Sequence, residues 1–166
     1  QTEYLSAISN SGENLMVIIN DILDFSKIES GKLTLEHRPI SIIKITNNIK
    51  KLLIHKANER NLAFNFYIEN DLPEWVMGDS VRLNQILVNL LGNAIKFTEK
   101  GKVELYCNVI NKTGNNCLIQ FIVKDTGIGI PADKHDLVFE RFKQAHDNTT
   151  RKFGGTGLGL SITNKL

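Results

Sequence analysis

Residues 80–98 are the most restrictive segment of the sequence, because the helix that they predict is apolar on nearly every side. Seven apolar residues are spread around it: Ile86, Leu87, Val88, Leu90, Leu91, Ala94 and Ile95. A helix of this kind is typical of a protein interior. Asp79 or Ser80 stands where an N-cap is expected, and the helix should run to about Thr98. The chain is therefore expected to bury this helix.

The same helix carries one polar stripe. Gln85, Asn89, Asn93 and Lys96 follow one another at spacings of four, four and three residues, which places them on one face. A buried amide without a partner costs about 1–3 kcal/mol, so a stripe of this kind needs partners. Two interpretations are open. The stripe either faces water or a loop, or it lines a cleft where amide oxygens ligate a hard cation and the lysine reaches phosphate.

Residues 1–30 predict a long helix with a broad apolar face. The apolar stripe comprises Tyr4, Ile8, Leu15, Ile18, Ile22 and Phe25, and it is widened by Leu5, Ile19, Leu23 and Ile28. Such a face requires more than one partner helix. The partner is either the first helix of a hairpin, which would precede residue 1, or another chain. Gly31 is placed to cap the C-terminus of this helix, and a domain boundary is expected beside it.

After Gly31 the pattern becomes mixed α/β. An amphipathic helix is predicted at 40–60, and strands are predicted at 32–36, 62–69, 102–110 and 117–125. The last two strands flank the sequence NKTGNN, which predicts a hairpin. In a symmetric hairpin Cys107 and Cys117 do not face each other, so no disulfide is expected.

Composition excludes several classes of function. The net charge is only +2 and basic residues are scattered, which argues against nucleic acid as a partner. No apolar run approaches the roughly 18 residues of a membrane helix, and no signal-peptide pattern opens the chain. No Cys/His set has the spacing of zinc ligands. A reducing, cytoplasmic setting without membrane contact by this segment is expected.

The stretch DTGIGIPAD follows an apolar strand, so Asp125 is expected at the end of that strand. Gly127 and Gly129 have no side chains, so the backbone beside Asp125 is accessible. The stretch fits a loose dinucleotide-binding pattern, G-x-G-x-x-A, but the βαβ unit and the later acidic residue that this pattern needs are missing. A tight turn explains the glycines alone. A buried carboxylate that accepts a hydrogen bond from an exocyclic amine explains the carboxylate as well.

The run KFGGTGLGL, residues 152–160, is close to a phosphate-binding P-loop. Gly154 and Gly159 have the required spacing, but Leu160 and Ser161 replace the Lys–Ser/Thr pair. A backbone nest before a helix N-terminus still suits phosphate, whereas a flexible hinge is the plainer interpretation. The polar residues 143–152 would make a lid.

Taken in order, these segments resemble a known family. Asn89-x-x-x-Asn93-Ala94-x-Lys96, Asp125-x-Gly127-x-Gly129, Phe139-x-x-Phe142 and Gly155-x-Gly157-x-Gly159 resemble the N, G1, F and G2 boxes of sensor histidine kinases. Residues 20–33, NDILDFSKIESGKL, resemble the end of the second helix of the dimerisation and phosphotransfer domain in these kinases. The sequences NLLGNAIKFT and TTRKFGGTGLGLSI are most similar to those of the hybrid kinases, which carry a receiver domain further along the chain.

The resemblance implies the domains and the fold. Residues 1–31 would belong to the dimerisation domain, and residues 32–166 would form the ATP-binding catalytic domain. That domain is a two-layer α/β sandwich, the fold shared with gyrase-type ATPases, and here one long helix of a helical hairpin precedes it. A homodimer through helix 1–30 and a response regulator or receiver domain are the implied partners.

The resemblance also implies the site. Asp125 would bind the adenine amine beside Gly127 and Gly129, and Phe97 would pack near the base. Asn93 and Asn89 would hold Mg²⁺, with Asn89 and Lys96 as the catalytic residues and Lys96 on phosphate. The triphosphate would be wrapped by Gly155, Thr156, Gly157, Leu158 and Gly159, and Phe139 and Phe142 would anchor the lid. The reaction would transfer the γ-phosphoryl group of ATP to a histidine, for relay to a response-regulator aspartate.

The sequence departs from the family in two respects. The acceptor histidine of the family, in a His-Glu-Ile/Leu-Arg-Thr/Ser-Pro motif, would lie before residue 1, and His37, His55, His135 and His146 are interpreted as surface or structural residues. The two strands that end the family's catalytic domain are also missing. The chain is therefore expected to be a fragment cut at both ends, with a bare sheet edge.

Three rival functions remain as alternatives. An ATPase of the gyrase or mismatch-repair type carries a glutamate that activates water where Asn89 stands, and an amide cannot act as a base. A serine kinase of the anti-sigma type shares the fold but not the long helix before it. A non-enzymatic module that dimerises through helix 1–30 is the third, and failure to bind ATP would favour it.

Overall fold

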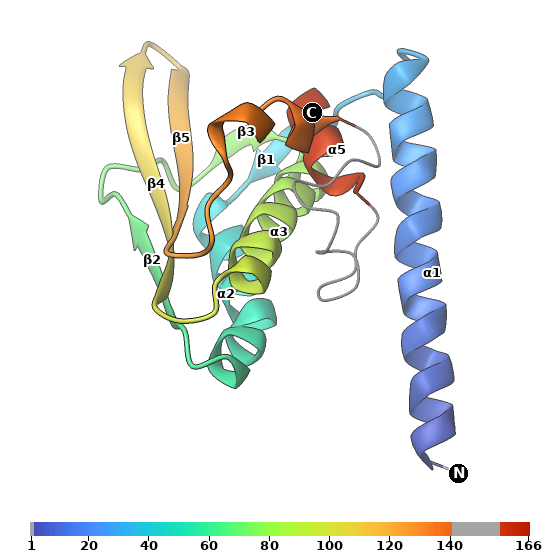
Figure 1. Ribbon diagram of the computed structural model, residues 1–166. Coiled ribbons are helices and arrows are strands. Elements are labelled where there is room, and N and C mark those ends of the chain that lie inside the picture. Colours follow the sequence, from blue (N-terminus) through green and yellow to red (C-terminus); the bar gives the residue numbers. More distant parts are fainter. Residues whose placement is uncertain (1, 141–156) are drawn as a thin grey trace. The chain divides into compact units, whose positions relative to one another are not determined.

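The computed structural model describes residues 2–140 and 157–166 (Figure 1). For part of the first helix it describes the backbone and not the side chains. The chain divides into two compact units. One comprises residues 35–130, and the other comprises residues 1–34 and 131–166.

The unit of residues 35–130 is a two-layer α/β sandwich, as predicted. Its sheet has the strand order β2 (Ala63–Ile68), β4 (Lys102–Thr113), β5 (Asn116–Asp125). Strand β2 pairs with β4 in parallel, and β4 pairs with β5 antiparallel, so the sheet is mixed. Helices α2 (Ile42–Glu59) and α3 (Ser80–Phe97) form the second layer.

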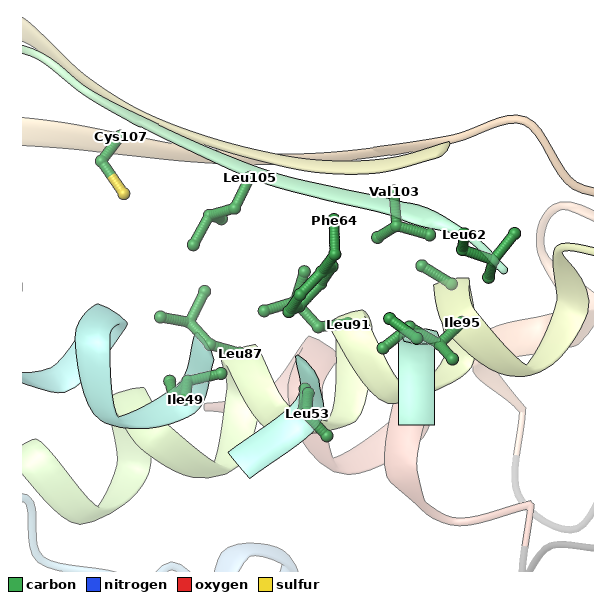
Figure 2. Close-up of a cluster of buried hydrophobic side chains, with 12 residues drawn as sticks. Ile49, Leu53, Leu62, Phe64, Leu87, Leu91, Ile95, Val103, Leu105 and Cys107 are labelled. Atoms are coloured by element: carbon green, nitrogen blue, oxygen red, sulfur yellow. The ribbon is translucent and has the colours of Figure 1, made fainter. Parts of the chain in front are cut away.

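The core of this unit lies between the sheet and the two helices, as Figure 2 shows. Val103, Leu105 and Cys107 alternate along β4, and all three are fully buried against the helices. From α3 the buried side chains are Leu87, Leu91, Ala94 and Ile95. The prediction that α3 is buried therefore holds for one face of the helix, because Ile86, Val88 and Leu90 are only half-buried and Val81 is exposed.

Helix α3 begins where the sequence predicted, and Asp79 rather than Ser80 is its N-cap. The Asp79 Oδ1 atom accepts hydrogen bonds from the backbone N–H groups of Val81 and Arg82, both at 3.0 Å. Its Oδ2 atom accepts one from the backbone N–H of Glu36 at 3.0 Å. The bonds from Arg82, Glu36 and Val81 lower the pKa of Asp79, because each stabilises the charged carboxylate.

The strand prediction for residues 32–36 is wrong, since the structure has no strand there. Two strands that the sequence did not predict lie close by, β1 (Arg38–Ile40) and β3 (Val76–Gly78), and they pair antiparallel with Pro39 opposite Met77. Each has only three residues, too few for an alternating pattern to show. In residues 32–36 the alternation exists without a partner strand, and Leu35 is 58% exposed.

The predicted hairpin is confirmed, and both of its strands extend further toward the turn. Cys107 lies opposite Phe121 and Cys117 lies opposite Lys112, so the two thiols are apart and both are free, as expected. Burial raises the pKa of the Cys107 thiol to about 11.

The other unit contains helix α1 (Thr2–Glu29), two 3-10 turns, η1 (Ala132–Lys134) and η2 (Leu137–Phe139), and helix α5 (Gly159–Lys165). Gly31 ends α1 at a φ of 65°, and the Lys32 N–H bonds the Lys27 carbonyl at 2.9 Å, which confirms the predicted cap. Phe25 of α1 packs with Leu158 and Ile162 in a small buried cluster. Across the described residues, no helix is long and apolar enough to cross a membrane.

Much of the predicted apolar stripe of α1 is exposed. Among the side chains that the structure describes, the exposed members are Tyr4, Leu15, Ile18, Ile19, Ile22 and Leu23, together with Met16. Exposed apolar residues that gather on one element in this way mark an interaction surface.

Candidate functional site

The polar stripe of α3 is present as predicted. Gln85, Asn89, Asn93 and Lys96 are all half-buried on the helix. The Asn93 Nδ2 atom donates to Asn89 Oδ1 at 3.3 Å, so the two carboxamides lie side by side. Gln85 instead accepts a hydrogen bond from Arg82 Nη1 at 2.7 Å. Within the described residues, no group of three His, Cys, Asp or Glu side chains is placed to hold a metal.

Lys96 lies at the last turn of α3, one turn beyond Asn93. Its ammonium group lies 4.8 Å from the centroid of the Phe97 ring, which favours the cation. Burial lowers the pKa of Lys96, because partial removal of water disfavours the charged form. A partly desolvated cation of this kind interacts strongly with an anion that approaches it.

The Asp125 turn lies directly after β5. The Asp125 Oδ1 atom accepts a hydrogen bond from the Gly127 N–H at 2.9 Å, which closes a tight Asx-type turn. Gly129 has a φ of 67°, a conformation that glycine adopts without strain. The expectation of a buried carboxylate is wrong, because Asp125 is exposed. The end of the strand is open to solvent here, and one side-chain oxygen is engaged within the turn.

The structure brings the Asp125 turn against the end of α3. The Ile128 N–H donates to the main-chain carbonyl of Phe97 at 3.3 Å. A Cβ atom on Gly127 would lie 2.6 Å from the same carbonyl oxygen, so only glycine fits at this position. The last turn of α3 and the Asp125 turn are therefore joined within residues 35–130. The βαβ unit of a dinucleotide-binding fold is not formed, since β5 runs antiparallel to its neighbour.

The residues predicted to wrap a triphosphate belong to the other unit. Gly155, Thr156 and Phe142 lie outside the described residues, as do residues 143–152. Gly157 has a φ of 69°, and Gly159 begins α5. The Leu158 side chain is 2% exposed and packs on Phe25, and the Leu158 carbonyl accepts hydrogen bonds from the Ile162 N–H at 2.9 Å and from Ser161 Oγ at 2.8 Å. The Phe139 side chain is 45% exposed at the end of η2.

Comparison with known proteins identifies the family. The model of the histidine kinase-, DNA gyrase B- and HSP90-like ATPase family matches residues 78–166, a segment that contains α3, β4, β5 and α5. The chain belongs to this family. The match includes every residue of the amide stripe and of the Asp125 turn.

Relatives of this chain include proteins named as signal transduction histidine kinases and hybrid histidine kinases. The chain is 43% identical over all of its 166 residues to the signal transduction histidine-protein kinase BarA of Escherichia coli K12. It is 40% identical, again over its whole length, to the hybrid signal transduction histidine kinase L of Dictyostelium discoideum. The chain spans 18% of the length of BarA and 10% of the length of kinase L.

A solved structure has the same fold as this domain. Full-length ShkA, crystallised in complex with AMPPNP, superposes with a TM-score of 0.81 at 33% identity. The match covers 99% of this chain and 33% of the ShkA chain.

Sequence reasoning missed two residues that hold the end of α3 and the Asp125 turn in place. The Thr126 Oγ1 atom accepts a hydrogen bond from the Lys102 N–H at 3.0 Å and donates to the Lys100 carbonyl at 3.2 Å, which pins the start of the Asp125 turn to the start of β4. Arg60 Nη1 donates to the carbonyl of Lys96 at 2.8 Å. Thr126 could have been found from the sequence, because it lies between Asp125 and Gly127 in the DTG tripeptide. No sequence pattern indicated the contact of Arg60, because 36 residues separate it from its acceptor.

Proposed function

We propose that this chain binds ATP with Mg²⁺ and is the catalytic part of a sensor histidine kinase. The γ-phosphoryl group of ATP would pass to a histidine outside this chain, and from there to an aspartate of a response regulator or receiver domain. The observation that carries this proposal is the amide pair Asn89–Asn93, with Lys96 one turn further on, next to the Asp125 turn. The identity with BarA and the AMPPNP complex of ShkA support it.

The paired carboxamides fit a magnesium ion. Mg²⁺ prefers oxygen ligands and takes only one or two from the protein when phosphates and water complete its shell. Asn93 and Asn89 lie side by side on one helix face, where Asn93 Nδ2 donates to Asn89 Oδ1, and each side chain carries one amide oxygen. A bound Mg²⁺ would neutralise charge on the phosphates as the phosphoryl group leaves. Asn89 also lacks the basicity to activate water, which favours transfer to a protein acceptor over hydrolysis.

The remaining roles follow the chemistry of each group. Asp125 would accept a hydrogen bond from the adenine amine through the oxygen that the turn leaves available, with Gly127 and Gly129 giving the base access to the backbone. Phe97 would lie beside the base, and Lys96 would pair with phosphate. The backbone of Gly155, Thr156, Gly157, Leu158 and Gly159 would surround the triphosphate.

We also propose that α1 belongs to the dimerisation domain, with the boundary at Gly31, and that a second copy of the protein covers its exposed apolar residues. Leu15 and Ile22 of this face are 57% and 49% exposed. The response regulator or receiver domain would then receive the phosphoryl group from the histidine of the dimer.

The test is a titration with a fluorescent ATP analogue, with and without Mg²⁺. The Asp125→Asn variant should bind at least about tenfold more weakly, because a charge-assisted hydrogen bond contributes about 1.5–3 kcal/mol. Asp71→Asn is the matched control, since Asp71 pairs with Lys112 near the opposite end of β4. Equal affinity of wild type and Asp125→Asn would contradict the adenine assignment, and absence of binding by the wild type would overturn the kinase function.

A further inference from the structure

The C-terminus of α3 is completely capped. The last four carbonyl groups of a helix have no partner within it and must find one elsewhere. In α3 these are the carbonyls of Ala94, Ile95, Lys96 and Phe97. The Ala94 carbonyl accepts hydrogen bonds from the Thr98 N–H at 3.1 Å and from Thr98 Oγ1 at 2.7 Å. The Phe97 carbonyl accepts one from the Ile128 N–H at 3.3 Å.

Arg60 donates hydrogen bonds to the two remaining carbonyls, those of Ile95 and Lys96. Its Nη1 atom donates to the carbonyl of Lys96 at 2.8 Å and to that of Ile95 at 3.3 Å. The guanidinium cation also lies at the negative end of the helix dipole, where a positive charge is favourable. Arg60 is therefore bonded to the main chain of the residue whose side chain would meet phosphate.

The backbone of Arg60 is itself held firmly. Arg60 is the C-cap of α2, and its N–H donates to the carbonyl of Ala57 at 3.1 Å. The Leu62 N–H bonds the same carbonyl at 3.0 Å, and both Ala57 and Leu62 are buried in the core. The guanidinium thus extends from a fixed point of the core toward the end of α3.

The Asp125 turn depends on the same helix end. Its Ile128 N–H bonds the Phe97 carbonyl, and its Gly127 lies against that carbonyl without room for a side chain. A displacement of the last turn of α3 would move the Lys96 side chain and the Asp125 turn together. Arg60 opposes such a displacement by its bonds to the carbonyls between those bonded by Thr98 and Ile128, in addition to the core packing of Ala94 and Ile95.

We propose that Arg60 is a positioning residue of the nucleotide site, which holds the Lys96 side chain and the Asp125 turn at their mutual distance through the main chain of α3. The inference rests on the proposed ATP function and adds to it a residue that is not among the proposed nucleotide contacts. It predicts that Arg60 affects affinity for ATP more than it affects the stability of the fold.

The experiment compares the purified wild type with Arg60→Ala, Arg60→Gln and Arg60→Lys. Arg38→Ala is the matched control, since Arg38 is an exposed arginine whose guanidinium pairs with Glu36 at 3.1 Å. Three quantities are measured: the Kd of a fluorescent ATP analogue with Mg²⁺, the hydrogen-exchange rate of the Ile128 amide without nucleotide, and the melting temperature. Arg60→Gln keeps hydrogen-bond donors without the charge, whereas Arg60→Lys keeps the charge without the planar fork of donors, so the two variants separate these contributions.

Arg60→Ala should raise the Kd about tenfold, since misplacement of a binding group by a small distance has effects of this size or larger. It should also accelerate exchange at Ile128, and Arg60→Lys should restore part of both. Arg38→Ala should change neither quantity. The inference is overturned if the Ile128 amide exchanges as in the wild type, or if the affinity falls only in proportion to a general loss of melting temperature.

The two proposals fail in different ways. A wild type that binds no ATP analogue overturns the kinase function, and the exchange rate of Ile128 then decides alone whether Arg60 positions the turn. A wild type that binds while Arg60→Ala binds equally well overturns only the role of Arg60.

Discussion

The main-chain carbonyl of Phe97 occupies the space that a side chain on Gly127 would need. An ideal Cβ there would lie 2.6 Å from the carbonyl oxygen and 2.9 Å from Asp125 Oδ1. The first of these neighbours is backbone at the end of a capped helix, so it cannot move aside as a flexible side chain would. The need for glycine at position 127 is therefore explained by packing within this chain, independently of any ligand.

Gly127→Ala should therefore destabilise the protein by about 1–3 kcal/mol, the usual range for overpacking, and should weaken binding of an ATP analogue. Denaturant unfolding and a nucleotide titration measure the two effects. Gly92→Ala in α3 is the control, because nothing lies within 4 Å of a Cβ at Gly92 and the change should stabilise the helix by about 0.5–1 kcal/mol. Equal unfolding free energies for wild type and Gly127→Ala would contradict the close contact.

Asn93→Ala should remove the dependence of nucleotide binding on Mg²⁺. The substitution deletes an amide oxygen that is proposed to ligate the ion and leaves Asn89 without its carboxamide neighbour. The measurement is the ratio of Kd values with and without Mg²⁺. Asn84→Ala is a suitable control on the same helix, since Asn84 is exposed and lies outside the stripe. A ratio unchanged from wild type in Asn93→Ala would rule out this ligand role.

Affinity for the ATP analogue should fall at high pH because of Lys96. Burial places the folded pKa of Lys96 below the ordinary value of 10.5, so its proton is lost earlier than that of an exposed lysine. Phosphate stabilises the charged form and raises the pKa again, so binding takes up a proton in this range. Affinity should decline as the pH rises through the lowered pKa. Lys96→Arg should abolish the decline, and a decline that persists in this variant would point to another group.

The N-cap of α3 should contribute to stability in a pH-dependent way. The folded pKa of Asp79 is lower than its ordinary 3.8. Its stabilisation is therefore complete above the unfolded pKa and is lost as the pH falls through the lowered folded value. Asp79→Ala should cost about 0.5–2 kcal/mol near neutral pH, as loss of an N-cap does. Asp79→Asn should retain most of the cap and lose the acid dependence, which unfolding curves between neutral and strongly acidic pH would show.

The parts of the fold that were predicted correctly are those with a long periodic pattern. The two strands of the hairpin alternate over many residues, and α3 has both a helical period and a capping residue at Asp79. The parts that were not predicted depend on tertiary pairing. Strands β1 and β3 are stabilised by each other rather than by their own sequence, while residues 32–36 alternate but find no partner.

The candidate site shows the same division. The amide stripe was visible because polar residues at helical spacing stand out on an apolar helix. The exposure of Asp125 was not visible, because it depends on how the chain leaves β5. The contacts of Arg60 with Ile95 and Lys96 join positions 35 and 36 residues apart, and no local pattern encodes such a contact.

The parallel pairing of β2 with β4 has a consequence for how this unit folds. Parallel neighbours need a crossover connection, and here that connection contains α3. The pairing of β2 with β4 is therefore a contact between residues distant in sequence, and a sheet that depends on such contacts folds more slowly than one made only of local hairpins. The amide stripe precedes β4 and the Asp125 turn follows β5, so neither half of the site could be excised as a short peptide that keeps its shape.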